Sequence, residues 1–366
     1  MKDINIVTFQ NAYNYGAILQ CYALQTILSS KKENDVKVLN YNNILISNVY
    51  KTFYKPQGKL KSLKYVKSFI KGVMYAKQTV PRNYKFKKFI NNNIHLTKSM
   101  SREEIIKTNY DNNTTFVVGS DQVWNTDITG GYDPVYMLDF APNARKISYA
   151  ASIGKNTLDS QYIEQIKNVL EKYSAISVRE KTAKEELEKY TKKEIIVTLD
   201  PTLLLEKKEW ESSVSQIKLS YKNYIFVYMP NKECIEIAKN IQEKTNKKIL
   251  YIDKKILFKH NSINISNADP FDFISYIKNA DYVVTTSFHA TIFSIIFNKK
   301  LWIALPNKVG SRITDLLEKL KMKNRCVNTF KEFATKKFDD EIDYTKVNEI
   351  LNKERQKSKE WLFKEI

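Results

Sequence analysis

Short apolar segments alternate with helical segments along most of the chain, and this alternation restricts the possible folds more than any other feature. In the first half, the apolar segments predict strands at residues 4–9, 36–41, 115–119, 146–153, 175–178 and 195–199. Helices are predicted at about 17–29, 160–172 and 181–190. Strands joined by helices form parallel sheets covered by helices, so the pattern indicates an α/β protein.

The alternation starts again after Asp200-Pro201-Thr202, where the proline ends the first series. Further strands are predicted at 224–229, 248–252, 281–286 and 301–305, with helices at about 232–244, 270–279, 290–297 and 312–320. A chain of 366 residues has the length of two domains. We therefore predict an N-terminal domain over 1–204, a C-terminal domain over 205–330, and a helical segment over 331–366 that ends in an amphipathic helix.

The segment from about 45 to 100 fits neither series, and we expect it to be a basic insertion in the first domain with short helices at 64–75 and 84–90. The chain carries a net charge of +20, and between Val36 and Arg102 there are 15 Lys or Arg and no Asp or Glu. Such a stretch is either a solvated face or a surface for an anionic partner, such as a phosphorylated small molecule, an acidic glycan, an anionic membrane or nucleic acid. Charge alone does not choose among these.

Several features favour a cytoplasmic protein. No apolar run reaches the roughly 18 residues that a membrane-spanning helix needs. The first residues enter a strand pattern directly and lack the parts of a secretion signal. Cys21, Cys234 and Cys326 are far apart and form no CxxC pair, which is typical of reduced thiols.

Polar residues directly follow the first-domain strands, where ligands bind in open α/β sheets. Asn14 and Gly16 follow the first strand, and the helix that begins there offers free N–H groups to an anion. Asp121 and Gln122 follow the strand at 115–119. An ordinary turn and a helix cap are the competing interpretations at these two places. Neither a GxGxxG fingerprint nor a GxxxxGK[ST] loop occurs, which argues against a dinucleotide cofactor.

Basic residues also follow predicted strands. Arg179 ends an apolar strand, where its planar guanidinium suits a carboxylate or phosphate, or else forms a structural pair with Glu180 or another acid. His289 follows Ser287 at the start of a helix, where an imidazole titrates near neutrality, although a structural histidine is the simpler alternative. Lys308 and Arg312 begin the next helix, either as site residues or as solvated charges.

In the second domain, His289, Lys308 and Arg312 together suit a small phosphorylated acid as ligand. No HExxH motif, nucleophile elbow, cysteine–histidine signature or metal cluster is present in the sequence, so hydrolysis by those routes is unsupported.

An ordered set of segments resembles the polysaccharide pyruvyl transferase family. The set comprises residues 11–16 with Leu19-Gln20, then 117–125, 148–154, 177–180, 199–201, 287–290 and 310–317. The resemblance implies two Rossmann-like domains with mostly parallel sheets facing a cleft, as in GT-B enzymes. It also implies transfer of a pyruvyl group from phosphoenolpyruvate onto a saccharide of a cell-surface polysaccharide or glycan precursor, as a ketal. Phosphoenolpyruvate is then a co-substrate, and no metal or redox cofactor is needed.

The same resemblance assigns roles to individual residues. It makes His289 and Arg179 catalytic, places Ser287, Lys308 and Arg312 at the donor, and places Asn14, Gly16, Asp121 and Gln122 at the acceptor or along the cleft. The chain departs from the family pattern in having Ala290 after the histidine, Gly16-Ala17 without a following acid, and Asp269-Pro270-Phe271-Asp272 in place of a Gly-Pro-Glu type turn.

Two other functions stay open from the sequence. One is sugar transfer from a nucleotide sugar on the same fold. The other is polyanion binding without catalysis through the basic stretch, which would leave His289 without a role. Under the pyruvyl transferase interpretation, we expect a saccharide acceptor, either lipid-linked or free, peripheral association with the inner face of an anionic membrane, and no nucleic-acid partner.

Overall fold

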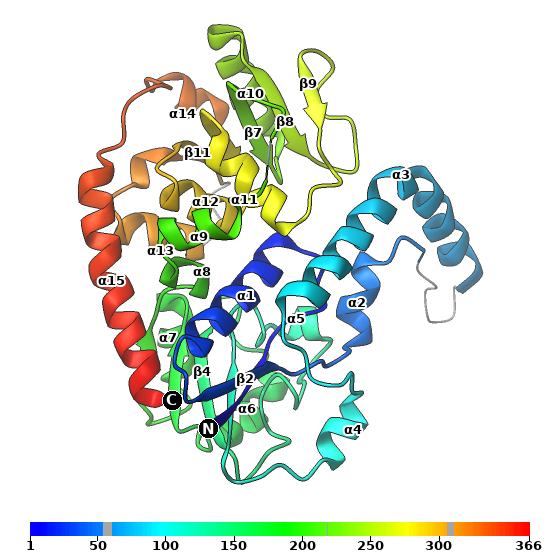
Figure 1. The fold of residues 1–366 in the computed structure, drawn as a ribbon, viewed down its shortest axis with the longest axis vertical. Coiled ribbons are helices and arrows are strands. Elements are labelled where there is room, and N and C mark those ends of the chain that lie inside the picture. Colours follow the sequence, from blue (N-terminus) through cyan, green and yellow to red (C-terminus); the bar gives the residue numbers. More distant parts are fainter. Residues whose placement is uncertain (54–60, 218, 306–310) are drawn as a thin grey trace. The chain divides into compact units, whose positions relative to one another are not determined.

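The computed structural model describes residues 1–53, 61–217, 219–305 and 311–366. It contains two six-stranded parallel sheets with helices between the strands, which confirms the predicted α/β class (Figure 1). The chain divides into two compact units. Unit 1 comprises Met1–Lys51, Lys88–Leu205 and Asn352–Ile366, and unit 2 comprises Thr52–Lys87 and Glu206–Leu351.

The sheet of unit 1 has the order β2-β1-β3-β4-β5-β6. Its strands are β1 (Lys2–Val7), β2 (Asn34–Val38), β3 (Thr114–Val118), β4 (Arg145–Ala151), β5 (Ala175–Val178) and β6 (Ile195–Val197). Parallel bridges from Val38 to Leu96 and from Tyr41 to Met100 place the segment 94–100 beside β2. This segment takes the place of the third strand, so the unit has a Rossmann-like order.

The sheet of unit 2 has the order β12-β11-β10-β7-β8-β9. Its strands are β7 (Tyr224–Tyr228), β8 (Lys248–Ile252), β9 (Ser262–Asn264), β10 (Tyr282–Thr285), β11 (Lys300–Ala304) and β12 (Cys326–Val327). Numbered from β7, this is the 3-2-1-4-5-6 order of a Rossmann fold. Both units therefore have the predicted Rossmann-like architecture.

The helices of the first half are α1 (Tyr15–Ser29), α2 (Ile44–Tyr50), α3 (Lys61–Asn93), α4 (Arg102–Lys107), α5 (Thr126–Thr129), η1 (Ser160–Tyr162), α6 (Ile163–Leu170), α7 (Lys181–Leu187) and α8 (Pro201–Leu204). Those of the second half are α9 (Lys207–Ser213), α10 (Lys232–Thr245), α11 (Pro270–Asn279), α12 (Phe288–Ile296), α13 (Ser311–Lys319), η2 (Lys323–Arg325), α14 (Phe330–Ala334) and α15 (Tyr344–Glu365). Within the described residues, none of these helices has both the length and the apolar character needed to cross a bilayer.

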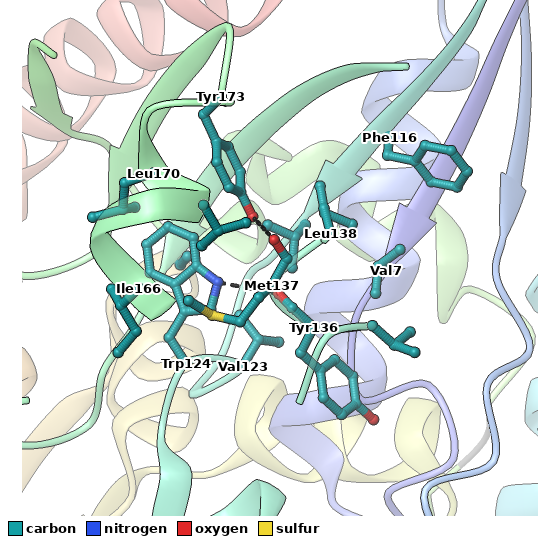
Figure 2. Close-up of a cluster of buried hydrophobic side chains, with 14 of the residues drawn as sticks. Val7, Phe116, Val123, Trp124, Tyr136, Met137, Leu138, Ile166, Leu170 and Tyr173 are labelled. Carbon is teal, nitrogen blue, oxygen red and sulfur yellow. Dashed lines mark hydrogen bonds between the residues drawn. The ribbon is translucent and has the colours of Figure 1, made fainter. Parts of the chain in front are cut away.

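A buried aromatic cluster holds the loop that follows β3 (Figure 2). Trp124 donates from its indole N–H to the backbone oxygen of Tyr136 over 3.1 Å, and the Tyr173 hydroxyl donates to the oxygen of Met137 over 3.0 Å. The Trp124 and Tyr173 rings meet edge to face, with centroids 5.9 Å apart. Because the polar ends of both buried side chains are satisfied, the cluster gains apolar burial without an unpaired donor, and it fixes the loop in place.

In unit 2, helices cover both faces of the sheet. On one face, Cys234 and Ile237 of α10 belong to the same buried cluster as Val227 of β7. On the other face, Phe226 meets Phe273 of α11 with ring centroids 5.9 Å apart. Strands buried on both faces read as continuous apolar runs, which is why β7 and β10 were recognisable in the sequence.

The prediction of two short basic helices at 64–75 and 84–90 was wrong, because α3 is one continuous helix with Pro81 inside it. A proline removes one helical hydrogen bond and so marks a probable helix break in a sequence. Contacts beyond the proline hold the helix together. Lys85 pairs with Asp272 of α11 over 3.1 Å, and the Phe86 ring is fully buried.

Candidate functional site

In an open α/β sheet, ligands bind beyond the carboxyl ends of the strands, at the point where the strand order reverses. That point lies between β1 and β3 in unit 1 and between β10 and β7 in unit 2. Asn14 follows β1, Asp121 and Gln122 follow β3, and Ser287 and His289 follow β10 at the start of α12. The polar residues selected from the sequence are therefore at the expected ligand edges of both sheets.

The two loops at the reversal point of unit 1 are tied together by Gln20 of α1. Its amide oxygen accepts from the Ser120 N–H over 2.9 Å, and its amide nitrogen donates to the Thr8 hydroxyl over 2.8 Å. The Thr8 hydroxyl in turn donates to the Ser120 oxygen over 3.1 Å. A fully buried glutamine with partners at both ends fixes the geometry of both loops.

Gly119 precedes this loop in a backbone conformation that requires glycine. Its φ is +128°, and a Cβ there would lie 2.0 Å from the backbone oxygen of Tyr149. L residues rarely adopt such a φ, so any side chain would force the β3 and β4 ends apart. This close approach brings the Asp121 loop against the end of β4.

Asn14 is the N-cap of α1. Its side-chain oxygen accepts from the N–H of Gly16 over 2.9 Å and from that of Ala17 over 3.3 Å. These are the N–H groups that the sequence interpretation offered to an anion, and in the structure Asn14 already satisfies them. Gly16 is the second residue of α1. The helix-cap interpretation therefore describes the local geometry of this loop.

Arg179 lies at the centre of a buried ionic cluster. Its guanidinium pairs with Asp200 over 2.9 Å, with Asp121 over 3.5 Å and with Glu180 over 3.8 Å, and its side chain is 2% exposed. Burial by itself lowers the pKa of Arg179, but the carboxylates of Asp200, Asp121 and Glu180 outweigh burial and raise that pKa above its usual value. The structural ion pair, one of the two interpretations of Arg179, is thus present, with Asp200 as the nearest acid.

The carboxylates of this cluster hold further donors from neighbouring strand ends. Asp200 accepts from the N–H of Thr202 over 3.0 Å and from its hydroxyl over 2.6 Å, and its other oxygen accepts from Ser120 over 3.2 Å. Glu180 accepts from the Ser152 hydroxyl over 2.6 Å. The cluster therefore joins the ends of β3, β4, β5 and β6. Asp200, Glu180, Ser120 and Ser152 were not chosen as site residues, although each directly follows a predicted strand or lies at its end.

Asp121 and Gln122 lie at the outer side of this cluster. The Asp121 side chain is 15% exposed, and one of its oxygens accepts from the Gln122 N–H over 2.9 Å. The Gln122 amide oxygen accepts from Asn125 over 2.9 Å. Gly154 leaves room for Gln122, because a Cβ there would lie 2.0 Å from that oxygen. Asp121 and Gln122 are thus held in place by their neighbours.

Ser287 and His289 lie together at the start of α12. Ser287 is the N-cap, and its hydroxyl accepts from the Ala290 N–H over 3.4 Å. The Ser287 N–H donates to the Thr285 hydroxyl over 2.9 Å, which connects the cap to the end of β10. His289 is 8% exposed, and its ring lies edge to face with that of Phe288 at 5.3 Å. The imidazole is therefore held at the positive end of a helix.

Arg312 also lies beside the start of α12. Its guanidinium carbon lies 5.8 Å from the centroid of the Phe288 ring, in a cation–π contact between the starts of α13 and α12. The structure thus brings Ser287, His289 and Arg312 together, whereas Lys308 lies outside the described residues. In the described part of the chain, no group of three or more His, Cys, Asp or Glu is placed to hold a metal ion.

The fold and these strand-end residues define a two-unit Rossmann-like α/β protein. It is similar to the Methanocaldococcus jannaschii UDP-GlcNAc 2-epimerase in complex with UDP-GlcNAc and UDP, with a TM-score of 0.52, 13% identity, and coverage of 99% of this chain and 98% of that one. The S. aureus MnaA–UDP structure has a TM-score of 0.49 and 14% identity, with coverage of 95% of this chain and 91% of that one. The E. coli heptosyltransferase WaaC with ADP has a TM-score of 0.40 and 10% identity, with coverage of 85% of this chain and 89% of that one. Identities this low concern the fold alone.

The family follows from the sequence itself. The profile of the polysaccharide pyruvyl transferase family matches residues 14–305, and the chain belongs to this family. No curated protein sequence matches the chain. The matched range contains both strand-end sites except Arg312 and Lys308.

Proposed function

We propose that this protein transfers a pyruvyl group from phosphoenolpyruvate onto two hydroxyl groups of a saccharide, forming a cyclic ketal. The family membership over residues 14–305 carries this proposal. The grouping of Ser287, His289 and Arg312 at the ligand edge of unit 2 supports it. These residues offer one titratable group and one fixed cation to a small anionic donor.

The donor end of the reaction is assigned to unit 2. Arg312 and Lys308 hold the carboxylate and phosphate of phosphoenolpyruvate by charge-assisted hydrogen bonds. Protonated His289 delivers its proton to the methylene carbon of the donor. The neighbouring carbon becomes electron-poor, the oxygen of a saccharide hydroxyl bonds to it, and the hydroxyl proton returns to His289. Positioned acid catalysis of this kind contributes about 10²–10⁴-fold in rate.

The second step closes the ketal. Another hydroxyl of the saccharide bonds to the same carbon while the bond from that carbon to the phosphate oxygen breaks. Inorganic phosphate leaves and takes up the second hydroxyl proton. The product carries a methyl group and a carboxylate on the ketal carbon, so atoms and charge balance without a metal or redox cofactor, and we expect turnover to be insensitive to a chelator.

Polar residues of unit 1 are assigned to further hydroxyl groups of the saccharide. Asp121 accepts a hydrogen bond from a saccharide hydroxyl, because its carboxylate reaches the surface while Arg179 behind it does not. Gln122 and the loop at Asn14 and Gly16 line the same edge. Arg179 is a positioning residue in this proposal, because its guanidinium faces three carboxylates and not an open ligand site.

Release of inorganic phosphate from phosphoenolpyruvate, measured with a panel of saccharide acceptors, tests the reaction. We expect His289→Asn to fold normally and to lower turnover by about 10²–10⁴-fold. His260→Asn, at an exposed histidine of the same unit, is the matched control and should be unchanged. Full turnover by His289→Asn would remove histidine from the scheme. Release of nucleotide from a nucleotide sugar, without phosphate release, would identify the chain as a glycosyltransferase instead.

We also propose that the protein is cytoplasmic and docks on an anionic membrane through the outer face of α3. Large apolar side chains on this face are between 48% and 68% exposed: Val66, Phe69, Ile70, Val73, Met74, Val80 and Tyr84. Their spacing places them on one side of the helix. They extend from Val66 to Tyr84, or about 27 Å along the helix. The opposite side of the helix faces the protein, as the burial of Thr79 and Phe86 indicates.

The charge around this apolar face favours lipid over a second protein chain. Lys71 and Lys77 are exposed beside it, and the sequence from Val36 to Arg102 contains no acid. Lysines that flank an apolar helix face bind anionic headgroups while the apolar residues enter the interface. Two copies of this face would instead bring like charges together with no acid between them.

Sedimentation with vesicles tests the membrane proposal. We expect binding to mixed phosphatidylcholine and phosphatidylglycerol vesicles, weakened by salt, and little binding to phosphatidylcholine alone. Ile70→Asn should reduce binding to the mixed vesicles. The double variant Lys71→Gln with Lys77→Gln should also reduce it. Ile106→Asn, at an exposed isoleucine of α4, is the control. Equal loss in the control, or dimerisation without vesicle binding, would contradict the proposal.

A further inference from the structure

Unit 2 contains a cavity of about 310 Å³ between the inner face of α3 and the carboxyl ends of β7 and β8. Tyr75, Gln78 and Arg82 line it from α3, Tyr228 from the end of β7, and Lys254 and Lys255 from the loop after β8. The volume is in the range of small-molecule sites. All of these residues are separate from those assigned to the donor.

The cavity lies at the ligand edge of the unit 2 sheet. Tyr228 is paired in register with Thr285 of β10, and the Thr285 hydroxyl donates to the Tyr228 oxygen over 2.6 Å. Ser287, the cap of α12, follows Thr285 by two residues. The cavity is therefore next to the reversal point of the strand order, beside the residues assigned to the donor.

The charges that face the cavity are mainly positive. Arg82, Lys254 and Lys255 line it together with one acid, Asp253. The Asp253 carboxylate accepts from the N–H of Lys255 over 2.7 Å and so holds the turn after β8. Burial and the nearby Arg82 guanidinium lower the pKa of Lys254, against the opposing effect of Asp253, although much of the Lys254 side chain is exposed. An anion between these cations would relieve their repulsion.

The remaining walls suit a sugar ring. Tyr75 and Tyr228 supply aromatic surface, on which the C–H face of a pyranose packs. Gln78 lines the same cavity, and its amide oxygen is buried without a hydrogen-bond partner in the described part of the chain. A hydroxyl group is the donor that would satisfy such an acceptor.

We propose that this cavity binds a saccharide bearing a phosphate group, with Arg82, Lys254 and Lys255 on the phosphate and the two tyrosines on the sugar. The inference rests on the proposed function in one respect: the phosphosaccharide is the acceptor of the pyruvyl group. The occupant is then a sugar phosphate, and the hydroxyls that react lie on the sugar that this cavity orients.

Calorimetric titration of the full chain with glucose 1-phosphate, glucose and inorganic phosphate tests the site. We expect glucose 1-phosphate to bind more tightly than either of the other two. Lys254→Gln with Lys255→Gln should weaken it by about tenfold or more, because charge-assisted hydrogen bonds are lost. Tyr75→Ala should weaken glucose 1-phosphate but not inorganic phosphate. Lys259→Gln, at an exposed lysine outside the cavity, is the control.

Equal affinities for glucose 1-phosphate and inorganic phosphate would overturn the proposal, as would the same loss in Lys259→Gln or preferential binding of UDP. The two proposals fail in different ways. Phosphate release from phosphoenolpyruvate without sugar-phosphate binding would leave the function and remove the cavity site. Binding of glucose 1-phosphate that depends on Lys254 and Lys255, without any pyruvyl transfer, would leave the site and remove the function.

Discussion

Replacing Arg179 with methionine removes the cation that pairs with Asp121, Glu180 and Asp200. The closest contact, 2.9 Å to Asp200, is worth about 6 kcal/mol in gross attraction at an effective dielectric constant of 20. Much of that is offset by the desolvation of the guanidinium, so the net loss is set by the carboxylates left behind. Breaking a buried pair in this way costs about 3–5 kcal/mol.

Urea unfolding and thermal melting measure this loss. For a unit of this size, the expected fall in Tm is about 6–20 °C. Arg145→Met is the matched control, because Arg145 pairs with Glu365 over 3.3 Å and its side chain is 43% exposed. A surface pair of this kind is worth less than about 1 kcal/mol. Adding Asp200→Asn to Arg179→Met should recover part of the stability, because one uncompensated charge is removed.

An Arg179→Met variant with a free energy of unfolding within about 1 kcal/mol of the wild type, or no lower than that of Arg145→Met, would contradict this expectation. Phosphoenolpyruvate affinity separates the two roles of Arg179. A positioning residue loses stability with little change in donor affinity in the folded fraction, whereas a residue that binds the donor directly loses affinity. Arg179→Lys, which keeps the charge but not the planar fork, should retain donor affinity and lose part of the stability.

Three further predictions concern unit 1. Gly119→Ala should lower the free energy of unfolding by more than the 1–3 kcal/mol of a strained backbone, because the new Cβ also meets the Tyr149 oxygen; an unchanged urea midpoint would contradict this. Asn14→Ala should cost about 1 kcal/mol through loss of the α1 cap, measured in the same way. Burial raises the pKa of Glu186, but hydrogen bonds, above all from Lys189, lower it overall. The ionised Glu186 carboxylate therefore contributes to stability above about pH 4.3, and this contribution is lost as the pH falls through its pKa in the folded state. Glu186→Gln should be less stable than the wild type at pH 7, and the two stabilities should approach each other at pH 3.

The long apolar strands and the capped helices could be predicted from the sequence because their signals are local. The predicted ranges 175–178, 248–252 and 270–279 coincide with β5, β8 and α11. The short strands β9 and β12 were not predicted, because neither has an apolar run of its own. Each exists because a neighbouring strand supplies its hydrogen-bond partners. Local pattern carries no information about such a partner.

For the candidate sites, too, local features could be predicted from the sequence and contacts between distant residues could not. The position of His289, Asp121 and Arg179 after strands could be predicted, because a polar residue at the end of an apolar run is visible in the sequence. The nearest partner of Arg179 could not, because Asp200 is 21 residues away and meets it only when β5 and β6 are adjacent. The sequence analysis named Glu180 or another acid as the partner, and Glu180 is the most distant of the three acids at 3.8 Å.

The sequence by itself determined that the chain forms two α/β units, and that polar groups end their strands, since both follow from residue order. Only the tertiary structure decided which of those groups meet. In the structure Arg179 pairs with three carboxylates, Arg312 lies over Phe288 beside His289, and the inner face of α3 lines a basic cavity. The physical reason is that burial and charge pairing depend on neighbours in space, and the neighbours are set by strand order and helix packing.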